Sequence, residues 1–169
     1  MIEELLDLAR IEAGKLAITV EPLALEAVLA EALAIVQPLM ASRGLEWIDE
    51  LAAASTWPVW AERLRLRQVF VNLLSNAGKY NREGGSISVR CARRGEHVRL
   101  SIIDTGIGIA ADKLAKLFQP FERLGAELGS VEGTGIGLAL SDQLARLMGA
   151  TLGAQTRPGV GSEFWIELR

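Results

Sequence analysis

The chain has 169 residues, 50% of them hydrophobic, and a mean hydropathy of +0.24, so it can bury one good core and a short appendage. The net charge is −3, the pI is near 5.3, and no lysine and arginine cluster is long enough to follow a phosphate backbone, which argues against nucleic-acid binding. The single Cys91 cannot form an internal disulfide, and we expect neither a signal peptide nor an apolar run that spans a bilayer. These features predict a cytoplasmic domain without membrane contact of its own, and they leave open whether a larger parent protein is membrane-anchored.

The first segment, residues 2–13, has the pattern of a short amphipathic helix that ends at Gly14. Its apolar side chains form one stripe, with acidic residues on the other face: Ile2, Leu5, Leu6 and Ala9. Two interpretations fit this pattern equally. The segment is either a terminal helix folded onto its own domain or the end of a longer helix or coiled coil.

The next segments combine short strands with a long helix. We expect a strand over 15–20, a helix over 22–40 that has a proline in its first turn, and short strands over 45–51 and 57–61. Because Pro58 has no N–H for a sheet hydrogen bond, the last of these strands should be very short or lie at a sheet edge.

The second half of the chain repeats this mixture. Apolar residues at three- and four-residue spacing predict the strongest helix of the chain over 62–80. Alternating apolar and polar residues around Gly95 predict a hairpin whose second strand ends at Asp104. Short helices and closing strands complete the predicted elements: helices near 111–118 and 136–148, and strands over 151–156 and 162–168. The order predicts an α+β fold.

Two amides and an ammonium group interrupt the apolar pattern of the 62–80 helix. Asn72, Asn76 and Lys79 recur about one turn apart and fall on the flank of the apolar face. An amide oxygen is a neutral ligand suited to Mg²⁺, and a lysine one turn further can hold a phosphate as a point charge. The structural alternative is a solvated polar face, so the interpretation as a site needs partners elsewhere in the chain.

Two glycine-containing loops could supply those partners. In "DTGIGIA", Asp104 ends a strand and can accept a hydrogen bond from an exocyclic amine, while Gly106 and Gly108 let the backbone turn sharply. The second loop, "EGTGIGLALS", leads directly into a helix whose unpaired N–H groups favour a phosphate. Each loop alone is a weak signal, because G-x-G occurs in many turns.

Four motifs in this order, "NLLSNAGKY", "DTGIG", "FQPFERLG" and "GTGIGLALS", resemble the N, G1, F and G2 boxes of the ATP-binding domain of sensor histidine kinases. The closing "GVGSEFWIEL" is similar to the last strand of that family, and "EELLDLARIEAGKL" to the end of its dimerisation helix. The resemblance implies a Bergerat-type two-layer α/β sandwich with a mixed sheet of about five strands covered by helices. It also implies two parts: residues 1–14 as the stub of the dimerisation and phosphoacceptor helix, and residues 15–169 as the catalytic domain.

The resemblance assigns ATP and Mg²⁺ as ligands. It implies that Asn76, with Asn72 as its partner, binds the metal, that Lys79 contacts phosphate and that Asp104 reads the adenine amine. Residues 119–134 would form the ATP lid, with Phe118 and Phe121 either as its aromatic anchors or as core residues, which for Phe118 is the better-supported interpretation. The other nucleotide contacts that the resemblance implies are Tyr80, Gly106, Gly108, Arg123, Gly133, Thr134, Gly135, Gly137 and Leu138.

One residue departs from the family pattern. Gly78 occupies a position where a branched apolar residue is expected. A glycine inside a helix costs up to about 1 kcal/mol relative to alanine, so we expect a looser helix end beside Lys79 and Tyr80 and a weaker affinity for nucleotide.

The resemblance also implies the reaction. In the ATPase and chaperone relatives of this fold, a glutamate that activates water stands where this chain has Asn72. An amide cannot take a proton from water at neutral pH, whereas transfer to a histidine imidazole needs no base from this domain. The motif therefore favours a protein-histidine kinase, with Asn76 and Lys79 as its catalytic residues, over an efficient ATPase.

The chain offers no suitable phosphoacceptor. His97 is the only histidine, and it lies in the predicted hairpin rather than in an acidic context on a helix. We therefore expect the acceptor on a separate dimerisation domain of a homodimeric parent that passes the phosphoryl group to a response regulator, with this chain alone a monomer. Two alternatives stay open: a nucleotide-binding regulatory or degenerate module that acts without phosphotransfer, and a protein-serine kinase of the anti-sigma type, which the F box and N-terminal segment favour less.

Overall fold

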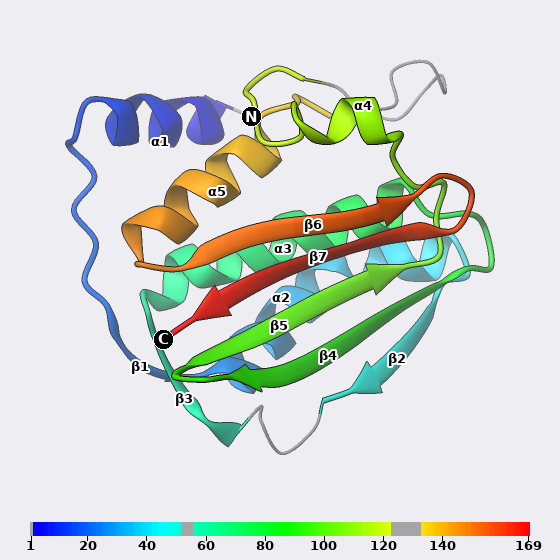
Figure 1. The fold of residues 1–169 in the computed structure, drawn as a ribbon, viewed down its shortest axis with the longest axis horizontal. Coiled ribbons are helices and arrows are strands. Elements are labelled where there is room, and N and C mark those ends of the chain that lie inside the picture. The colour runs from blue at the N-terminus through cyan, green and yellow to red at the C-terminus, as the bar shows by residue number, and fades with distance from the viewer. Residues whose placement is uncertain (1, 52–55, 123–132) are drawn as a thin grey trace.

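The computed structural model describes residues 2–51, 56–122 and 133–169 (Figure 1). The helices are α1 (Ile2–Glu12), α2 (Leu25–Ser42), α3 (Arg63–Lys79), α4 (Ala111–Leu114) and α5 (Gly137–Leu147). The strands are β1 (Glu21–Ala24), β2 (Glu46–Glu50), β3 (Pro58–Ala61), β4 (Ser86–Arg94), β5 (His97–Asp104), β6 (Thr151–Arg157) and β7 (Gly161–Leu168).

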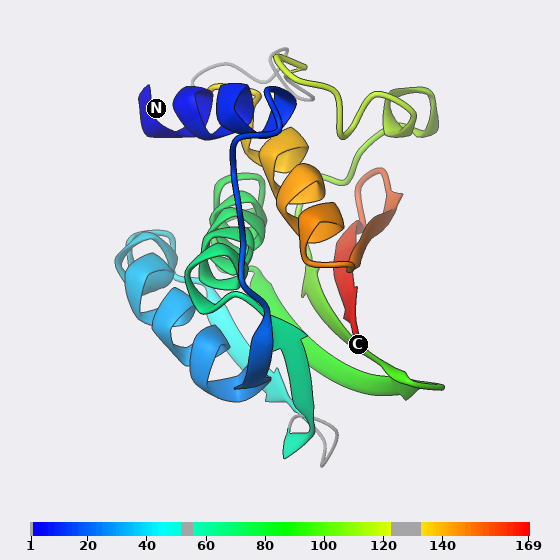
Figure 2. The ribbon, with the colours of Figure 1, turned by 90° about the vertical axis from the view of Figure 1, so that its left-hand side faces the viewer.

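The main sheet has five strands in the order β2-β4-β5-β7-β6. β2 runs parallel to β4, and every other neighbouring pair is antiparallel. Helices α2, α3 and α5 cover one face of this sheet, and no helix in the described part of the chain covers the other face (Figures 1 and 2). The arrangement is a two-layer α+β sandwich with a mixed five-stranded sheet, as predicted.

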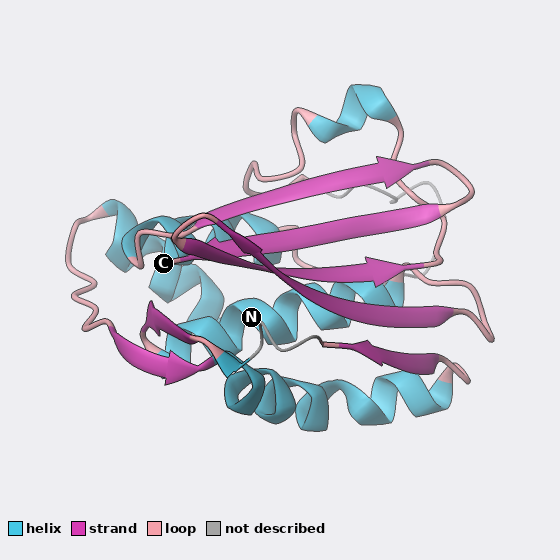
Figure 3. Cartoon of the chain, turned by 60° about the horizontal axis from the view of Figure 1, so that its bottom comes forward, coloured by secondary structure: helices cyan, strands magenta, loops and turns pink. Residues whose placement is uncertain are grey.

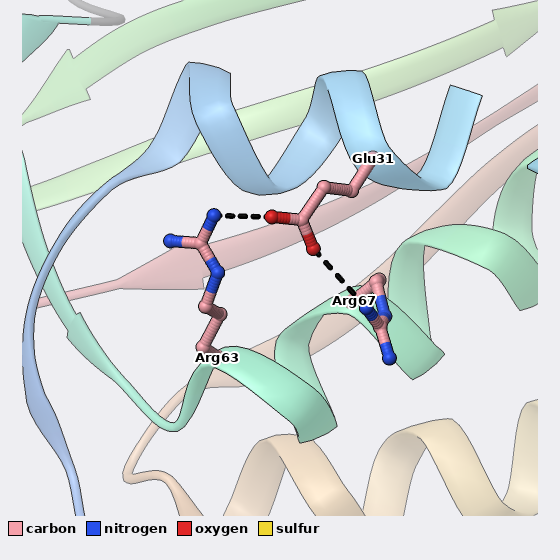
Figure 4. Close-up of polar contacts among 3 residues, drawn as sticks. All are labelled: Glu31, Arg63 and Arg67. Atoms are coloured by element: carbon pink, nitrogen blue, oxygen red, sulfur yellow. Dashed lines mark hydrogen bonds and ion pairs between the residues drawn. The ribbon is translucent and has the colours of Figure 1, made fainter. Parts of the chain in front are cut away.

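Helix α3 lies at the centre of the helical layer. Its apolar positions are buried, as its spacing predicts: Leu66, Val69, Phe70, Leu73, Leu74 and Ala77. Full burial of a side chain such as Phe70 contributes about 1.5–3 kcal/mol to folding. The two helices α2 and α3 are also joined at the surface, where Glu31 of α2 accepts hydrogen bonds from Arg63 and Arg67 of α3 (Figure 4). Such exposed pairs stabilise little, so apolar packing holds α3 in place.

The segment before α2 differs from the sequence prediction. Residues 15–20 form no strand, and the strand lies instead at β1, where Pro22 pairs with Trp60 of β3. Helix α2 consequently begins at Leu25 rather than at the proline. β1 and β3 form a separate two-stranded sheet, so Pro58 lies in a short strand of that sheet, as its missing N–H predicts (Figure 3).

Helix α2 also corrects the expectation that no segment is apolar enough to span a bilayer. Its 18 residues have a mean hydropathy of 1.5, and by length and composition alone they could cross a membrane. In the fold, however, α2 packs against α3 and contributes buried side chains to the core: Leu25, Val28, Leu29, Ala32, Val36 and Met40. A core helix of this kind passes the same test, so the membrane signal is weak.

Helix α1 contacts the domain through the side opposite its predicted apolar stripe. Leu8 is buried, and Asp7 forms an ion pair of 2.7 Å with Arg65 of α3. The stripe itself is exposed: Ile2 is 72% accessible, and Leu6 is 51% accessible. The helix is therefore folded onto its own domain, while its apolar stripe faces away, and the division of the chain at residue 14 stays a prediction.

The open face of the sheet contains a tight aromatic contact that can be tested. A Cβ at Gly153 of β6 would lie 2.5 Å from the ring of Trp165, and the Arg99 guanidinium lies 4.6 Å from that ring's centroid. Because the ring is confined, Gly153→Ala should lower the free energy of unfolding by about 1–3 kcal/mol. Urea unfolding measures this loss, and the same substitution in a Trp165→Leu background should cost much less. An equal cost in both backgrounds would show that the ring is not the cause.

Candidate functional site

A cavity of about 500 Å³ opens where α3, the loop after β5 and the start of α5 meet. It brings together eleven of the residues predicted from the sequence: Asn72, Asn76, Lys79, Tyr80, Asp104, Gly108, Gly133, Thr134, Gly135, Gly137 and Leu138. Gly106 lies directly beside it, in a hydrogen bond with Asp104. Arg123 and most of the predicted lid, residues 123–132, lie outside the described residues.

Asp104 ends β5 at the wall of the cavity and is 6% accessible. Its Oδ1 accepts hydrogen bonds from the backbone N–H of Gly106 at 2.8 Å and of Ser162 at 3.3 Å. Burial raises the pKa of Asp104 to about 6, although the two N–H donors act in the opposite direction. No described residue donates a hydrogen bond to the second oxygen, Oδ2, so a ligand in the cavity can do so.

The glycines of the first loop are required by close backbone contacts. A Cβ at Gly106 would lie 2.3 Å from the carbonyl oxygen of Tyr80, and one at Gly108 would lie 2.1 Å from that of Arg157. Gly108 also has a φ of +67°, which favours glycine. The loop thus passes between the end of α3 and the β6–β7 turn, and this confines the cavity wall.

Asn72 has a structural role that the sequence did not reveal. Its Nδ2 donates to the carbonyl of Gly137 and, at 2.9 Å, to Oγ of Ser141, which fastens the start of α5 to α3. A Cβ at Gly137 would lie 2.4 Å from Oδ1 of Asn72, so the contact needs glycine there. The N–H groups of this amide are engaged, and Oδ1 is the atom left for a metal or ligand.

Asn76 and Lys79 also line the cavity, and their side chains make no hydrogen bond within the described part of the chain. Among those residues, no three histidine, cysteine, aspartate or glutamate side chains gather to hold a metal ion. A divalent cation would therefore bind amide oxygen and the oxygens of its ligand. This donor set fits Mg²⁺, which commonly takes few protein ligands and completes its coordination with phosphate and water.

The second glycine loop is turned by local contacts. Oγ1 of Thr134 accepts a hydrogen bond of 3.3 Å from the N–H of Ile136, and Gly135 has a φ of +70°. The carbonyl of Gly135 accepts a hydrogen bond of 2.9 Å from the N–H of Phe121, which joins the F box to this loop. Phe118 packs against the core, as expected, whereas Phe121 is 67% accessible and is not a core residue.

Gly78 does not interrupt α3, and its expected effect on nucleotide affinity stays a prediction. The helix continues to Lys79, and Gly78 is buried, with a virtual Cβ 3.1 Å from Cδ2 of Leu39 in α2. The glycine therefore lets the ends of the two helices approach closely. A branched residue at this position would have to displace Leu39.

Several cavity residues were missed in the sequence. Apolar side chains complete the wall, with Ser162 as the polar addition: Ile107, Ile109, Leu117 and Phe164. The signal that could have located Ser162 is the preceding Gly161, whose φ is +138° and whose virtual Cβ lies 1.9 Å from the carbonyl oxygen of Asp104. Glu4 of α1 and Glu122 of the F box also line the cavity, although neither was singled out within its motif.

Known proteins are similar to this chain in sequence and in fold. The family model of histidine kinase-, DNA gyrase B- and HSP90-like ATPases matches residues 61–169. The sensor histidine kinase GacS of Pseudomonas protegens is 38% identical over 99% of this chain, which spans only 19% of that relative's length. Full-length ShkA in complex with AMPPNP is 29% identical, with a TM-score of 0.83 over 99% of this chain and 34% of that one. The Acinetobacter baumannii histidine kinase AdeS is 25% identical, with a TM-score of 0.80 over 99% of this chain and 75% of that one.

These matches confirm the resemblance drawn from the four sequence motifs. The matched region begins at β3 and contains α3, both glycine loops and the closing strands, which are the elements that build the cavity. The chain belongs to the histidine kinase-, DNA gyrase B- and HSP90-like ATPase family, in which it is homologous to the sensor histidine kinases.

Proposed function

We propose that this chain is the ATP-binding catalytic domain of a sensor histidine kinase, which transfers the γ-phosphate of ATP to a histidine on a separate domain. The observation that carries the proposal is that the cavity has two different ends along α3, one at Asp104 and one at the start of α5. Tyr80, the C-cap of α3, lies against the loop of Asp104, whereas Asn72, near the middle of the helix, holds the start of α5. The eight residue steps from Asn72 to Tyr80 rise roughly 12 Å, a length suited to adenosine with its phosphates. The AMPPNP complex of the related ShkA supports this choice of nucleotide.

The Asp104 end suits adenine. The exocyclic amine of adenine is a hydrogen-bond donor, and an ionised carboxylate can only accept. Oδ1 of Asp104 is occupied by the two backbone N–H groups, which leaves Oδ2 for the base. Guanine presents a carbonyl in place of the amine, so two acceptors would oppose each other at a buried position. The site should therefore select adenine over guanine.

The α5 end suits the phosphates. Helix α5 begins at Gly137, and the side chain of its N-cap residue, Ile136, accepts no hydrogen bond from the first turn. The first N–H groups of the helix therefore remain for phosphate oxygens. Asn76, with Oδ1 of Asn72, would hold Mg²⁺, and Lys79 would contact a phosphate as a point charge. When bound, Mg²⁺ neutralises the charge that develops on the phosphates during transfer.

The phosphoacceptor belongs to another domain in this proposal. His97 begins β5 and Asp104 ends it, so the two lie roughly 23 Å apart along the strand. An imidazole at His97 therefore cannot reach a phosphate in the cavity. We infer that the acceptor histidine lies on the parent's dimerisation domain, in a homodimeric and cytoplasmically signalling protein, and that a response regulator receives the phosphoryl group.

Transfer itself is tested with an acceptor supplied in trans. The purified chain, incubated with radiolabelled ATP, Mg²⁺ and the dimerisation domain of a homologous sensor kinase, should label that domain on histidine in an acid-labile form. The chain alone should show little ATP hydrolysis, because Asn72 cannot act as a base. Rapid ATP hydrolysis without an acceptor would contradict the kinase assignment. So would saturable nucleotide binding that leads to no labelling of any homologous acceptor domain.

Asn76→Ala should weaken the Mg²⁺-dependent binding of AMPPNP by at least about tenfold, because it removes the amide oxygen proposed to hold the metal. The thermal stability of the apo domain should hardly change, since this side chain makes no hydrogen bond within the described residues. Calorimetric titration with and without Mg²⁺ measures the first effect. Gln68→Ala, on the same helix but hydrogen-bonded to Arg65, is the matched control and should bind normally. Loss of folding in Asn76→Ala would make the residue structural.

Asp104 should give the apo domain a distinctive pH dependence. Its pKa is about 6 in the folded state and 3.8 as the ordinary value, so the folded state binds the proton more tightly. The contribution of Asp104 to the free energy of unfolding is therefore fully present below pH 4, and it is lost as the pH rises through about 6. Asp104→Asn should be more stable than the wild type at pH 7, by up to about 3 kcal/mol, and this difference should vanish toward pH 4. Urea unfolding across this range measures it, and a more stable wild type at pH 7 would contradict the argument.

A further inference from the structure

The nucleotide site depends on the C-terminal end of α3. Lys79 is the last residue of the helix, and Tyr80 is its C-cap. The last carbonyl groups of a helix have no partner within it, and together they carry partial negative charge. The N–H of Tyr80 is held by the carbonyl of Asn76 at 3.0 Å, whereas the carbonyls at this end need partners from outside the helix.

Arg43, the C-cap residue of α2, supplies partners for this end. Its Nη1 donates to the carbonyl of Gly78 at 3.0 Å and to that of Lys79, and its Nη2 donates to the carbonyl of Asn81 at 2.8 Å. The guanidinium is partly buried and spans three carbonyls across the end of the helix. A planar, permanently charged fork can make these bonds together, whereas an ammonium group on a flexible stem cannot match the same geometry.

The turn that Arg43 holds is in direct contact with the loop of Asp104. The carbonyl of Tyr80 accepts a hydrogen bond of 3.2 Å from the N–H of Ile107. The buried Asn81 donates from Nδ2 to the carbonyl of Ser86 at 3.0 Å, and its Oδ1 accepts from Thr105 at 3.3 Å. A shift of this turn would therefore move Lys79 and Tyr80, and it would also move the loop on which the orientation of Asp104 depends.

We propose that Arg43 is a positioning residue of the nucleotide site. It lies outside the cavity lining, and it acts by fixing the backbone of residues 78–81 and by offsetting the negative end of α3. The inference rests on the proposed function, because it takes Lys79 and Tyr80 to contact the nucleotide.

The experiment compares Arg43→Met and Arg43→Lys with the wild type by calorimetric titration with AMPPNP and Mg²⁺, at a temperature where every variant is folded. Arg63→Met is the matched control, because Arg63 also joins α3 to α2, through Glu31, but at the opposite end of α3 (Figure 4). Arg43→Met should raise the Kd at least tenfold, Arg43→Lys should raise it by a smaller factor of three or more, and Arg63→Met should leave it within twofold.

A purely structural role predicts a different result. Arg43→Met and Arg63→Met would then change the Kd alike once both are folded, and that result would overturn the proposal, as would a Kd for Arg43→Met within twofold of the wild type. Should Arg43→Met fail to fold, Arg43→Lys decides: a Kd raised threefold supports the role, and an unchanged Kd overturns it. If the wild type itself does not bind AMPPNP, the proposed function fails and this inference fails with it. If all variants bind AMPPNP with the same Kd, the proposed role of Arg43 fails, while the proposed function stands.

Discussion

The packing of α3 between the sheet, α2 and α5 is the contact on which both the core and the cavity depend. One face of the helix contributes Phe70 and Leu73 to the core, and its flank carries Asn72 and Asn76 toward the cavity. Because core side chains are closely packed, the flank cannot rotate without disturbing them. The hydrophobic effect thus fixes the orientation of polar groups that contribute little to stability themselves.

The same helix determines where its neighbours end or begin. Asn72, near the middle of α3, holds the first residue of α5, and Gly78 lets the C-terminal end of α3 approach α2 closely. Both contacts occur where glycine removes a Cβ that would collide, so the glycines serve backbone packing as well as any ligand. This explains why the motif glycines are needed even at positions such as Gly106, which lies beside the cavity rather than in its lining.

Much of this arrangement could be predicted from the sequence, because the relevant signals are local. The period of α3 and the hairpin around Gly95 follow from patterns within short windows, and the residues that gather at the cavity lie in short motifs that resemble those of the family. The errors lie where distant segments decide the outcome. Residues 15–20 alternate like a strand but pair with no strand in the described part of the chain, whereas Pro22 lies in β1 because β3 pairs with it. The buried side of α1 likewise depends on a distant residue, because Asp7 of this side pairs with Arg65, 58 residues away. The contacts of Arg43 and of Ser162 could not be predicted from the sequence either, because their partners are also distant along the chain.

Asp104 illustrates how a site can oppose stability. Burial raises the pKa of Asp104 to about 6, so folding disfavours the charged form that neutral pH still produces, and the two backbone donors compensate for part of the lost hydration. A neutral side chain of the same shape would suit the apo fold better. A donor that enters the cavity would complete the hydrogen bonds of this carboxylate at Oδ2. An adenine bound as proposed would satisfy this buried carboxylate, and that contact would couple nucleotide binding to the stability of the loop around it.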